Sequence, residues 1–250
     1  MRCPGRRIRK ALALILVFGL TGCRLLSPSV PPPVTSFEEA EEALESSRED
    51  VRIEGVRYLG DSMSPRAIPL LAELLDDPSL LVRIEVTLAL NNISDPRTIE
   101  PLREALKDSE EPVRFSAASA LYELGDYSGE EVLIEALSSE YEDFRFQALM
   151  FLGRMRSRRA LDGIISLLND PQPRTRSTAA YILGLFGDES AVEGLLRALN
   201  DPDPRVRKDS WEALKEISGR EYPFHYDGDP LLRKKEIRTW ELWWEDEANP

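Results

Sequence analysis

The sequence has almost none of the residues that build metal centres or carry thiol chemistry. Its 250 residues include one histidine, His225, and two cysteines, Cys3 and Cys23. A single histidine excludes a two-histidine metal site and a histidine-ligated zinc cluster within a monomer. The sequence also contains no glycine-rich phosphate loop and no nucleophile-elbow motif. We therefore expect a protein that is not an enzyme and that needs no metal or cofactor.

Positive charge is also in short supply. The chain has 32 Lys and Arg against 45 Asp and Glu, which gives a net charge of −13. Five of the positive charges lie in the N-terminal leader described next, so the chain without that leader has 27 against 45, a net charge of −18. Such a surface repels phosphate backbones, and this argues against nucleic-acid binding.

The N-terminus has the composition of a secretory signal. A cluster of arginines and Lys10 precedes the apolar stretch Ala11–Gly19, which is too short to span a membrane. The tetrad Leu20-Thr21-Gly22-Cys23 resembles a bacterial lipobox. That resemblance implies a signal peptide over residues 1–22, diacylglycerol on the Cys23 thiol, and a fatty acid such as palmitate on the new amino terminus. The alternative is a simple secretory signal that is cut nearby.

Residues 23–35 are predicted to form the lipid anchor and a spacer. The spacer contains Pro28 and the run Pro31-Pro32-Pro33, which favour an extended polyproline-like chain. An anchored protein of this kind lies on the extracytoplasmic side of the cell envelope, at the outer membrane or the cell membrane. Two or more acyl chains hold a protein firmly, whereas one chain does not.

The rest of the chain repeats with a period of 31 residues. Each unit carries a dipeptide whose second member is arginine, and a leucine eight residues after the first member. The dipeptides are Val51-Arg52, Val82-Arg83, Val113-Arg114, Phe144-Arg145, Thr175-Arg176 and Val206-Arg207. The leucines are Leu59, Leu90, Leu121, Leu152, Leu183 and Leu214, and a second leucine column follows at Leu75, Leu106, Leu137, Leu168 and Leu199. A fixed period of this length indicates a solenoid.

Each unit has the pattern of two amphipathic helices. In the third unit, Val113, Ala117, Leu121 and Leu124 recur at three- and four-residue spacing. Glycines and prolines separate the helices, and Asp188 is a predicted N-cap. Ser36 and Glu39 form a predicted capping box, which places a half unit at the start of the array. We expect an all-α solenoid over residues 36–218, with about five full repeats after this half unit.

The pair of helices with Asp-Pro before Val-Arg resembles the short HEAT repeat of the phycobilisome-lyase type. The resemblance implies an α-α superhelix. The signatures of ankyrin and tetratricopeptide repeats are absent. The array departs from its own pattern at Phe144 and Thr175, and Ser138 to Tyr141 replace the Asp-Pro turn.

The arginine column has two interpretations. Six aligned guanidinium groups could bind anions as a strip. Alternatively, each guanidinium ties neighbouring turns together through carbonyl groups and aspartates, because its planar donors suit that role. The aspartates in question are Asp76, Asp108, Asp170 and Asp201. We favour the second, structural interpretation.

Residues 219–250 leave the period and contain three tryptophans near their end. Ile237, Trp240 and Trp244 share one helical face, and an array needs a cap over its apolar end. We therefore predict a tryptophan-rich capping helix. The alternative is an aromatic ligand site near Tyr222–Trp244. Such a site would fit an accessory protein that resembles a lyase or a chaperone and acts on a tetrapyrrole or a substrate protein.

An acidic ridge is the candidate binding surface. Its residues lie on the second helices, away from the leucine column, and we expect them on the concave face. They are Glu73, Glu100, Glu104, Glu131, Glu135, Asp162 and Glu193. Like charges at i and i+4 repel by a few tenths of a kcal/mol, so a cluster of them favours a basic partner protein. A merely solvating surface is the alternative, and a purely structural envelope component is a third possibility. We predict a non-enzymatic, protein-binding scaffold that is tethered to a bacterial membrane.

Overall fold

The computed structural model describes residue 31 and residues 33–248. The predictions for the signal peptide, for Cys23 and for most of the spacer therefore lie outside the described residues. Residues 33–248 belong to one compact unit, Pro33–Pro250. The described residues contain helices and no strand, which confirms the all-α class.

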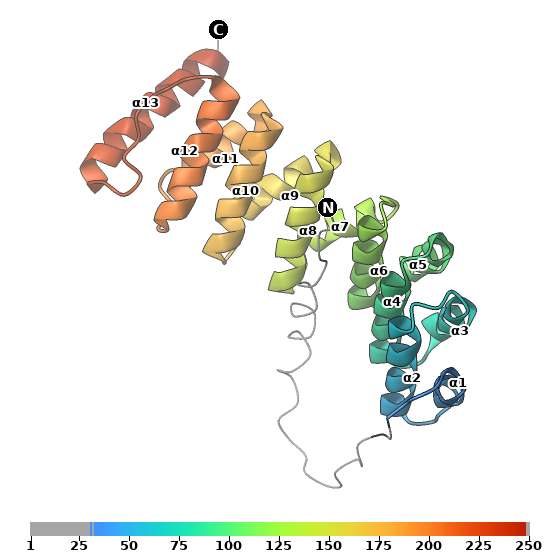
Figure 1. The fold of residues 1–250 in the computed structure, drawn as a ribbon. Coiled ribbons are helices and arrows are strands. Elements are labelled where there is room, and N and C mark those ends of the chain that lie inside the picture. The colour runs from blue at the N-terminus through green and yellow to red at the C-terminus, as the bar shows by residue number, and fades with distance from the viewer. Residues whose placement is uncertain (1–30, 32, 249–250) are drawn as a thin grey trace, which may run out of the picture. The chain divides into compact units, whose positions relative to one another are not determined.

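The helices alternate between two layers along the chain (Figure 1). The helices that carry the Val-Arg dipeptides form the first-helix layer: α2 (Glu49–Asp61), α4 (Leu80–Ile93), α6 (Glu111–Glu123), α8 (Glu142–Met155), α10 (Pro173–Phe186) and α12 (Pro204–Ser218). The shorter helices form the second-helix layer: α1 (Phe37–Leu44), α3 (Ala67–Glu73), α5 (Ile99–Ala105), α7 (Glu130–Ala136), α9 (Leu161–Ser166) and α11 (Val192–Ala198). Single 3-10 turns extend several of them: Leu74–Asp76, Pro96–Thr98, Arg158–Ala160, Leu167–Asn169 and Glu189–Ala191. The last helix is α13 (Pro230–Ala248).

The periodic leucines build the core. All six leucines of the first column are completely buried, from Leu59 to Leu214. In the second column Leu137, Leu168 and Leu199 are buried, whereas Leu75 and Leu106 are partly buried. Burying one such side chain contributes about 1.5–3 kcal/mol. No helix pair buries its own stripe, so the units are stable only when they stack.

The predicted helix ends are largely correct. Ser36 caps α1 by accepting a hydrogen bond from the backbone N–H of Glu39 at 3.1 Å. The return half of the predicted capping box is wrong, because the Glu39 carboxylate accepts from the backbone and hydroxyl of Thr35 instead. Gly187 ends α10 with a φ of 66°, a conformation that glycine adopts freely, and Asp188 caps the following turn as predicted.

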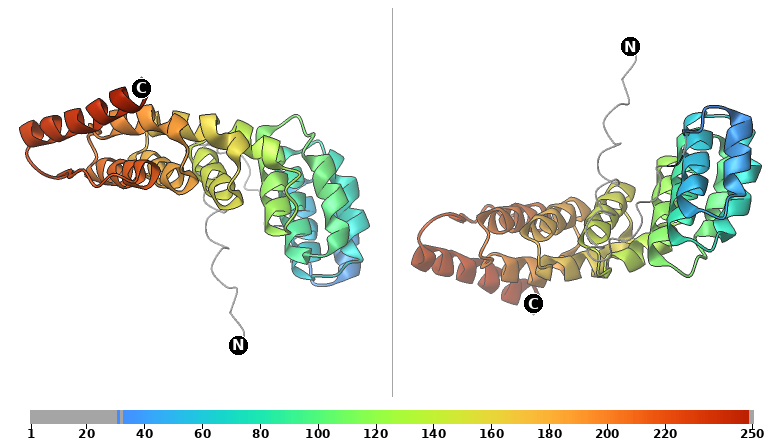
Figure 2. Two further views of the ribbon diagram at one scale, coloured as in Figure 1. Left: turned by 90° about the horizontal axis from the view of Figure 1, so that it is seen from above. Right: turned by 90° about the horizontal axis from the view of Figure 1, so that it is seen from below.

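Two pairs of consecutive first helices approach each other very closely, α2 with α4 and α10 with α12. A Cβ on Gly60 of α2 would lie 2.8 Å from the Cα of Ala89, and one on Gly184 of α10 would lie 2.8 Å from the Cα of Ala213. Clefts open between the second helices, as described below. Unequal spacing in the two layers bends an array, and within this unit the first-helix layer follows the inner side of the bend (Figures 1 and 2).

The C-terminal segment covers the end of the array. Trp240 of α13 is completely buried and meets Tyr222 edge to face, with ring centroids 5.1 Å apart. The indole N–H of Trp211 on α12 donates to the carbonyl of Tyr222, and Phe224 is buried beside them. These contacts agree with the predicted capping role of the aromatic residues.

Candidate functional site

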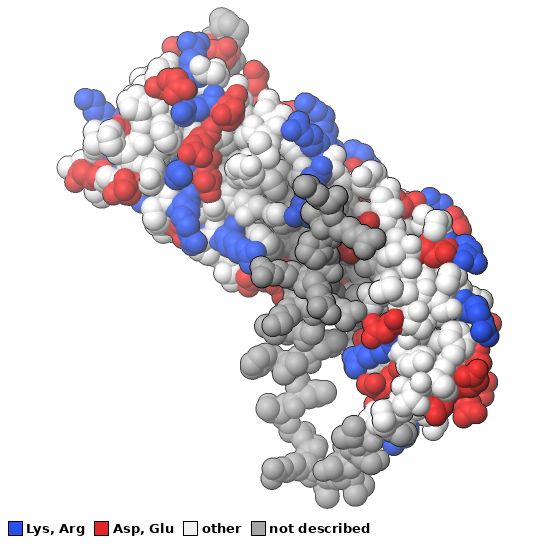
Figure 3. All heavy atoms as spheres, viewed as in Figure 1, with Lys and Arg blue, Asp and Glu red and all other residues white. Residues whose placement is uncertain are grey.

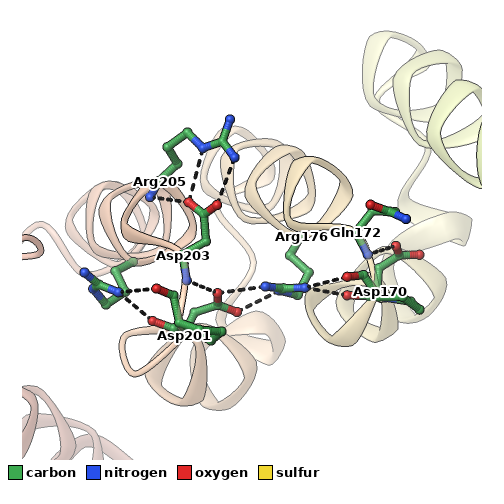
Figure 4. Close-up of polar contacts among 9 residues, drawn as sticks. Asp170, Gln172, Arg176, Asp201, Asp203 and Arg205 are labelled. Atoms are coloured by element: carbon green, nitrogen blue, oxygen red, sulfur yellow. Dashed lines mark hydrogen bonds and ion pairs between the residues drawn. The ribbon is translucent and has the colours of Figure 1, made fainter.

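The arginine column ties successive turns together (Figure 4). Arg176 donates from Nε and Nη2 to the two carboxylate oxygens of Asp201, at 2.7 and 2.9 Å, and from Nη1 to the carbonyl of Asp170 at 2.8 Å. The same fork joins Arg52 to Asp77, Arg83 to Asp108 and Arg145 to Asp170. All six arginines donate to a carbonyl six residues earlier in the chain.

These bonds exclude the reading of the column as an anion-binding strip and confirm the structural interpretation. The hydrogen bond from each arginine to its aspartate raises the pKa of Arg52, Arg83, Arg145 and Arg176 above the ordinary value, against the opposing effect of burial. One predicted partner is wrong: Asp77 accepts from Arg52, whereas the adjacent Asp76 is exposed.

The series is interrupted at Arg114. The position that would hold its aspartate is Ser139, so among the described residues the Arg114 guanidinium is bonded only to the carbonyls of Asp108 and Ser109. A pocket of about 270 Å³ opens there, and its lining includes Arg114, Ser139 and Glu135 of the acidic ridge. The missing carboxylate therefore leaves both an incomplete fork and an opening between α6 and α7.

The structure places all seven residues of the predicted ridge on the second-helix layer with exposed side chains. Four of them are partly neutralised. The ion pairs are Glu100 with Arg103 at 2.6 Å, Glu104 with Lys107 at 2.8 Å, Glu193 with Arg197 at 3.9 Å, and Glu131 with Arg159. Such exposed pairs contribute little to stability, about 0–1 kcal/mol each. Glu73, Glu135 and Asp162 have no cationic partner among the described residues.

The expected location of the ridge on the concave face is wrong. The ridge lies on the second helices, and the first-helix layer follows the inner side of the bend (Figures 1 and 2). In the first-helix layer, small residues let α2 approach α4 and α10 approach α12 closely, whereas clefts open between second helices. The ridge is therefore an outer surface of the array.

Two clefts bring ridge residues into concave surroundings. One is a cleft of about 610 Å³ between α3 and α5, where Glu100, Glu104 and Asp76 surround the apolar Leu75 and Ala105. The other is the pocket at Arg114, to which Glu135 belongs. Acidic groups around a partly apolar floor can receive the cationic side chains and alkyl stems of a basic peptide.

Residues 31 and 33–248 hold no cluster of three metal-binding side chains. The His225 side chain is 60% exposed, and its Nδ1 lies 2.6 Å from the Glu236 carboxylate. Among the described helices, none combines the length and apolar character that a membrane span requires.

Sequence reasoning missed a second charged surface, on α13. A groove between α11 and α13 is lined by Lys234 and Lys235 together with apolar side chains. The signal was present in the sequence, because Leu231-Leu232 is followed directly by Arg233-Lys234-Lys235. Figure 3 shows charges of both signs at the end of the array formed by α12 and α13.

Comparisons with known proteins agree with this architecture. The family model for HEAT repeats matches residues 37–122 and 161–223, more than half of the chain. The unmatched stretch between them contains Ser139, where the arginine–aspartate series is interrupted. The comparison with curated proteins finds no match.

Solved structures of similar fold include natural and designed solenoids. A designed armadillo repeat protein in complex with the peptide (KR)4 has a TM-score of 0.53 at 18% identity, covering 73% of this chain and 100% of that chain. The complex of CpcE and CpcF of phycocyanin lyase from Nostoc sp. PCC7120 has a TM-score of 0.50 at 18% identity, covering 88% of this chain and 100% of that one. An engineered protein has a TM-score of 0.51 at 21% identity, covering 82% of this chain and 61% of its own. At these identities the likeness shows the fold.

Proposed function

The chain belongs to the HEAT-repeat family, and from this premise we propose that it is a non-enzymatic scaffold that binds a basic partner protein. The proposal includes a lipid anchor on Cys23 that holds the scaffold on the extracytoplasmic side of a bacterial membrane. The partner docks on the acidic ridge of the second-helix layer. A solenoid presents repeated surface positions in fixed register, which suits recognition of an extended partner.

The observation that carries the proposal is a set of three carboxylates on the second helices that have no cationic partner among the described residues, one of which, Glu135, lines a pocket. Glu73, Glu135 and Asp162 are exposed on three different second helices and are held by helices whose core is fully buried. A basic partner gains complementary charge from them without first breaking an ion pair of the scaffold. The designed armadillo protein shows that a solenoid of similar fold can be solved with a peptide of alternating lysine and arginine.

A triple substitution tests the ridge. The variant E73Q/E135Q/D162N removes the three unpaired charges, and we expect it to weaken binding of a fluorescent (KR)4 peptide roughly tenfold, because each exposed charge pair contributes about 0.2–1 kcal/mol. The matched control E110Q/E189Q/E216Q removes three exposed carboxylates outside the ridge. Equal loss in both variants would show that net charge alone attracts the peptide, and would reject the ridge.

The partner itself is sought by cross-linking in intact cells followed by mass spectrometry. A protein that cross-links to the wild-type chain and to the control variant, but not to the ridge variant, meets the proposal. Identical cross-links from all three chains would contradict it.

The anchor is tested separately. We expect the wild-type chain to incorporate an alkyne fatty acid in growing bacteria and to sediment with membranes. Substitution of Cys23 by serine should abolish the label and release the chain from the membrane fraction. Membrane sedimentation of the serine variant would refute anchoring through this residue, without bearing on the ridge.

A second candidate function is an accessory role like that of a lyase or a chaperone, acting on a tetrapyrrole or a substrate protein. The observation that favours it is the fold likeness to the CpcE and CpcF complex of phycocyanin lyase. A tetrapyrrole bound near the aromatic cap should quench the fluorescence of Trp240 and shift the absorbance of the pigment. A flat titration of both signals with a linear tetrapyrrole would reject this alternative.

A further inference from the structure

The largest groove described above lies between α11 and α13, with a volume of about 1080 Å³. Its apolar lining includes leucines and an isoleucine, and its charged lining consists of four cations and one carboxylate, Glu241. The apolar residues are Leu196, Leu231, Ile237 and Leu242. The cations are Arg197, Lys234, Lys235 and Arg238. The groove is therefore basic, although the chain has a net charge of −13.

Two of these cations have no use within the fold. Lys234 and Lys235 are exposed, and their ammonium groups make no ion pair or hydrogen bond with any described residue. Arg238 differs, because it is paired with Glu241 and Glu245 on its own helix. The fold therefore gains nothing from Lys234 and Lys235 that the structure shows.

Two leucines of α13 are also largely exposed to solvent. Leu231 is 80% exposed and Leu242 is 47% exposed, although both line the groove. The opposite side of α13 already faces the rest of the protein, because Trp240 and Glu236 on that side are buried. Exposed leucine side chains beside unpaired lysines indicate a surface to which another molecule binds.

We propose that this groove binds an acidic amphipathic helix of a partner protein. The apolar stripe of that helix packs against the leucines between α11 and α13, and its flanking carboxylates face Lys234 and Lys235. A groove with two helical walls suits a third helix, the mode in which apolar anchors recur at i, i+3, i+4 and i+7. From Pro230 to Leu242 the groove follows about 18 Å of α13, which matches roughly three turns of a bound helix.

This surface adjoins the acidic ridge only at α11, where Arg197 of the groove pairs with Glu193 of the ridge, and it is opposite to the ridge in charge. It neither requires the ridge to bind anything nor depends on the membrane anchor. With both surfaces occupied, the chain would join a basic protein to an acidic one.

The test uses two synthetic helices labelled with a fluorophore. Both carry leucine at i, i+3, i+4 and i+7, and their other positions are glutamate in one and lysine in the other. Fluorescence anisotropy with the full chain should show saturable binding of the glutamate helix, weakened by salt, and at least roughly tenfold weaker binding of the lysine helix. The variant K234E/K235E should lose at least roughly tenfold in affinity for the glutamate helix.

The apolar contribution is tested by L231S/L242S, which removes two exposed side chains and should also weaken binding about tenfold. The controls are R154E/R220E and L185S, which change exposed cations and an exposed leucine outside the groove. Circular dichroism checks that each variant remains helical. Equal loss in the control and groove variants, or binding of both helices alike, would overturn the proposal.

Two other occupants would also overturn it. If vesicles of phosphatidylglycerol bind the chain, and K234E/K235E abolishes that binding while the glutamate helix never binds, the groove is a membrane contact. If sedimentation velocity shows a dimer that K234E/K235E dissociates, and the glutamate helix does not compete, the occupant is a second copy of the chain.

Discussion

Replacing Ser139 with aspartate should repair the interrupted arginine–aspartate series and stabilise the protein. The backbone at this position already has the geometry of the intact turns. The N–H of Ser139 donates to the carbonyl of Ala136 at 3.2 Å, as the N–H of Asp201 donates to Ala198 at 3.1 Å. The Ser139 hydroxyl accepts from the N–H of Tyr141, and the aspartates of the intact turns accept from the same relative position.

The expected gain in stability comes from carboxylate hydrogen bonds that Arg114 lacks. Its guanidinium is already partly buried and bonded to two carbonyls, so a new carboxylate adds a fork without burying another arginine. Charge-assisted hydrogen bonds contribute about 1.5–3 kcal/mol, and desolvation of the carboxylate together with the nearby Glu111 and Glu135 subtracts from this. We expect a net stabilisation of about 1–2 kcal/mol, which raises the Tm by roughly 2–8 °C for a chain of this size.

Thermal unfolding followed by circular dichroism measures the effect. The matched control is Ser138→Asp, which puts the same charge on the adjacent, exposed residue of the turn. In an Arg114→Met background the substitution at Ser139 should lose its benefit, because the fork has no donor. An unchanged or lowered Tm for Ser139→Asp, or an equal rise for Ser138→Asp, would refute the reasoning that the carboxylate is the missing part.

Three further predictions concern the same framework. Asp170→Asn should destabilise the chain by about 2–4 kcal/mol in urea titrations, because Arg145 then loses its carboxylate partner in a buried site. Substitution of the exposed Asp76 by asparagine is the control, and it should change the free energy of unfolding by less than about 0.5 kcal/mol. Gly184→Val should cost about 1–3 kcal/mol in the same titration, since its Cβ would meet the backbone of Ala213 at 2.8 Å and force α10 and α12 apart. The third prediction concerns acid. Hydrogen bonds from the Arg205 side chain and backbone lower the pKa of Asp203 to about 2 from an ordinary value of 3.8. The stabilising contribution of Asp203 is therefore complete above about pH 4 and is lost as the pH falls toward 2. The difference in stability between wild type and Asp203→Asn should therefore shrink over that window, and a difference that stays constant from pH 5 to pH 2 would contradict the assigned cause.

Much of the fold could be predicted from spacing alone. The leucine at every 31st position is buried in every unit, and the half unit, the cap at Asp188 and the role of Trp240 follow from helical periodicity and from the need to cover an apolar end. These features depend on local pattern, which a single sequence contains in full.

The features that could not be predicted depend on distances between units. Sequence alone does not show that Gly60 lies against Ala89, or which layer follows the inner side of the bend. Asp76 and Asp77 are neighbours of the same type, and only the geometry of the turn shows which one meets Arg52. The pairing of Glu131 with Arg159 joins two different units, so the ridge carries less free charge than the glutamates alone suggest.

The hydrogen bonds made by the repeat arginines explain how one acidic chain would carry the two proposed docking surfaces of opposite charge. The arginines of the repeat are hydrogen-bonded within the turns. Each donates to a carbonyl, and in four units the arginine also donates to a carboxylate. They therefore contribute little to the potential of the outer surface, and the charge seen by a partner is set by residues outside the series. On the second helices these are the free carboxylates of Glu73, Glu135 and Asp162, and on α13 they are Lys234 and Lys235. Because the framework holds the two groups on different helices, neither has to rearrange to neutralise the other, and each can select its own partner by charge.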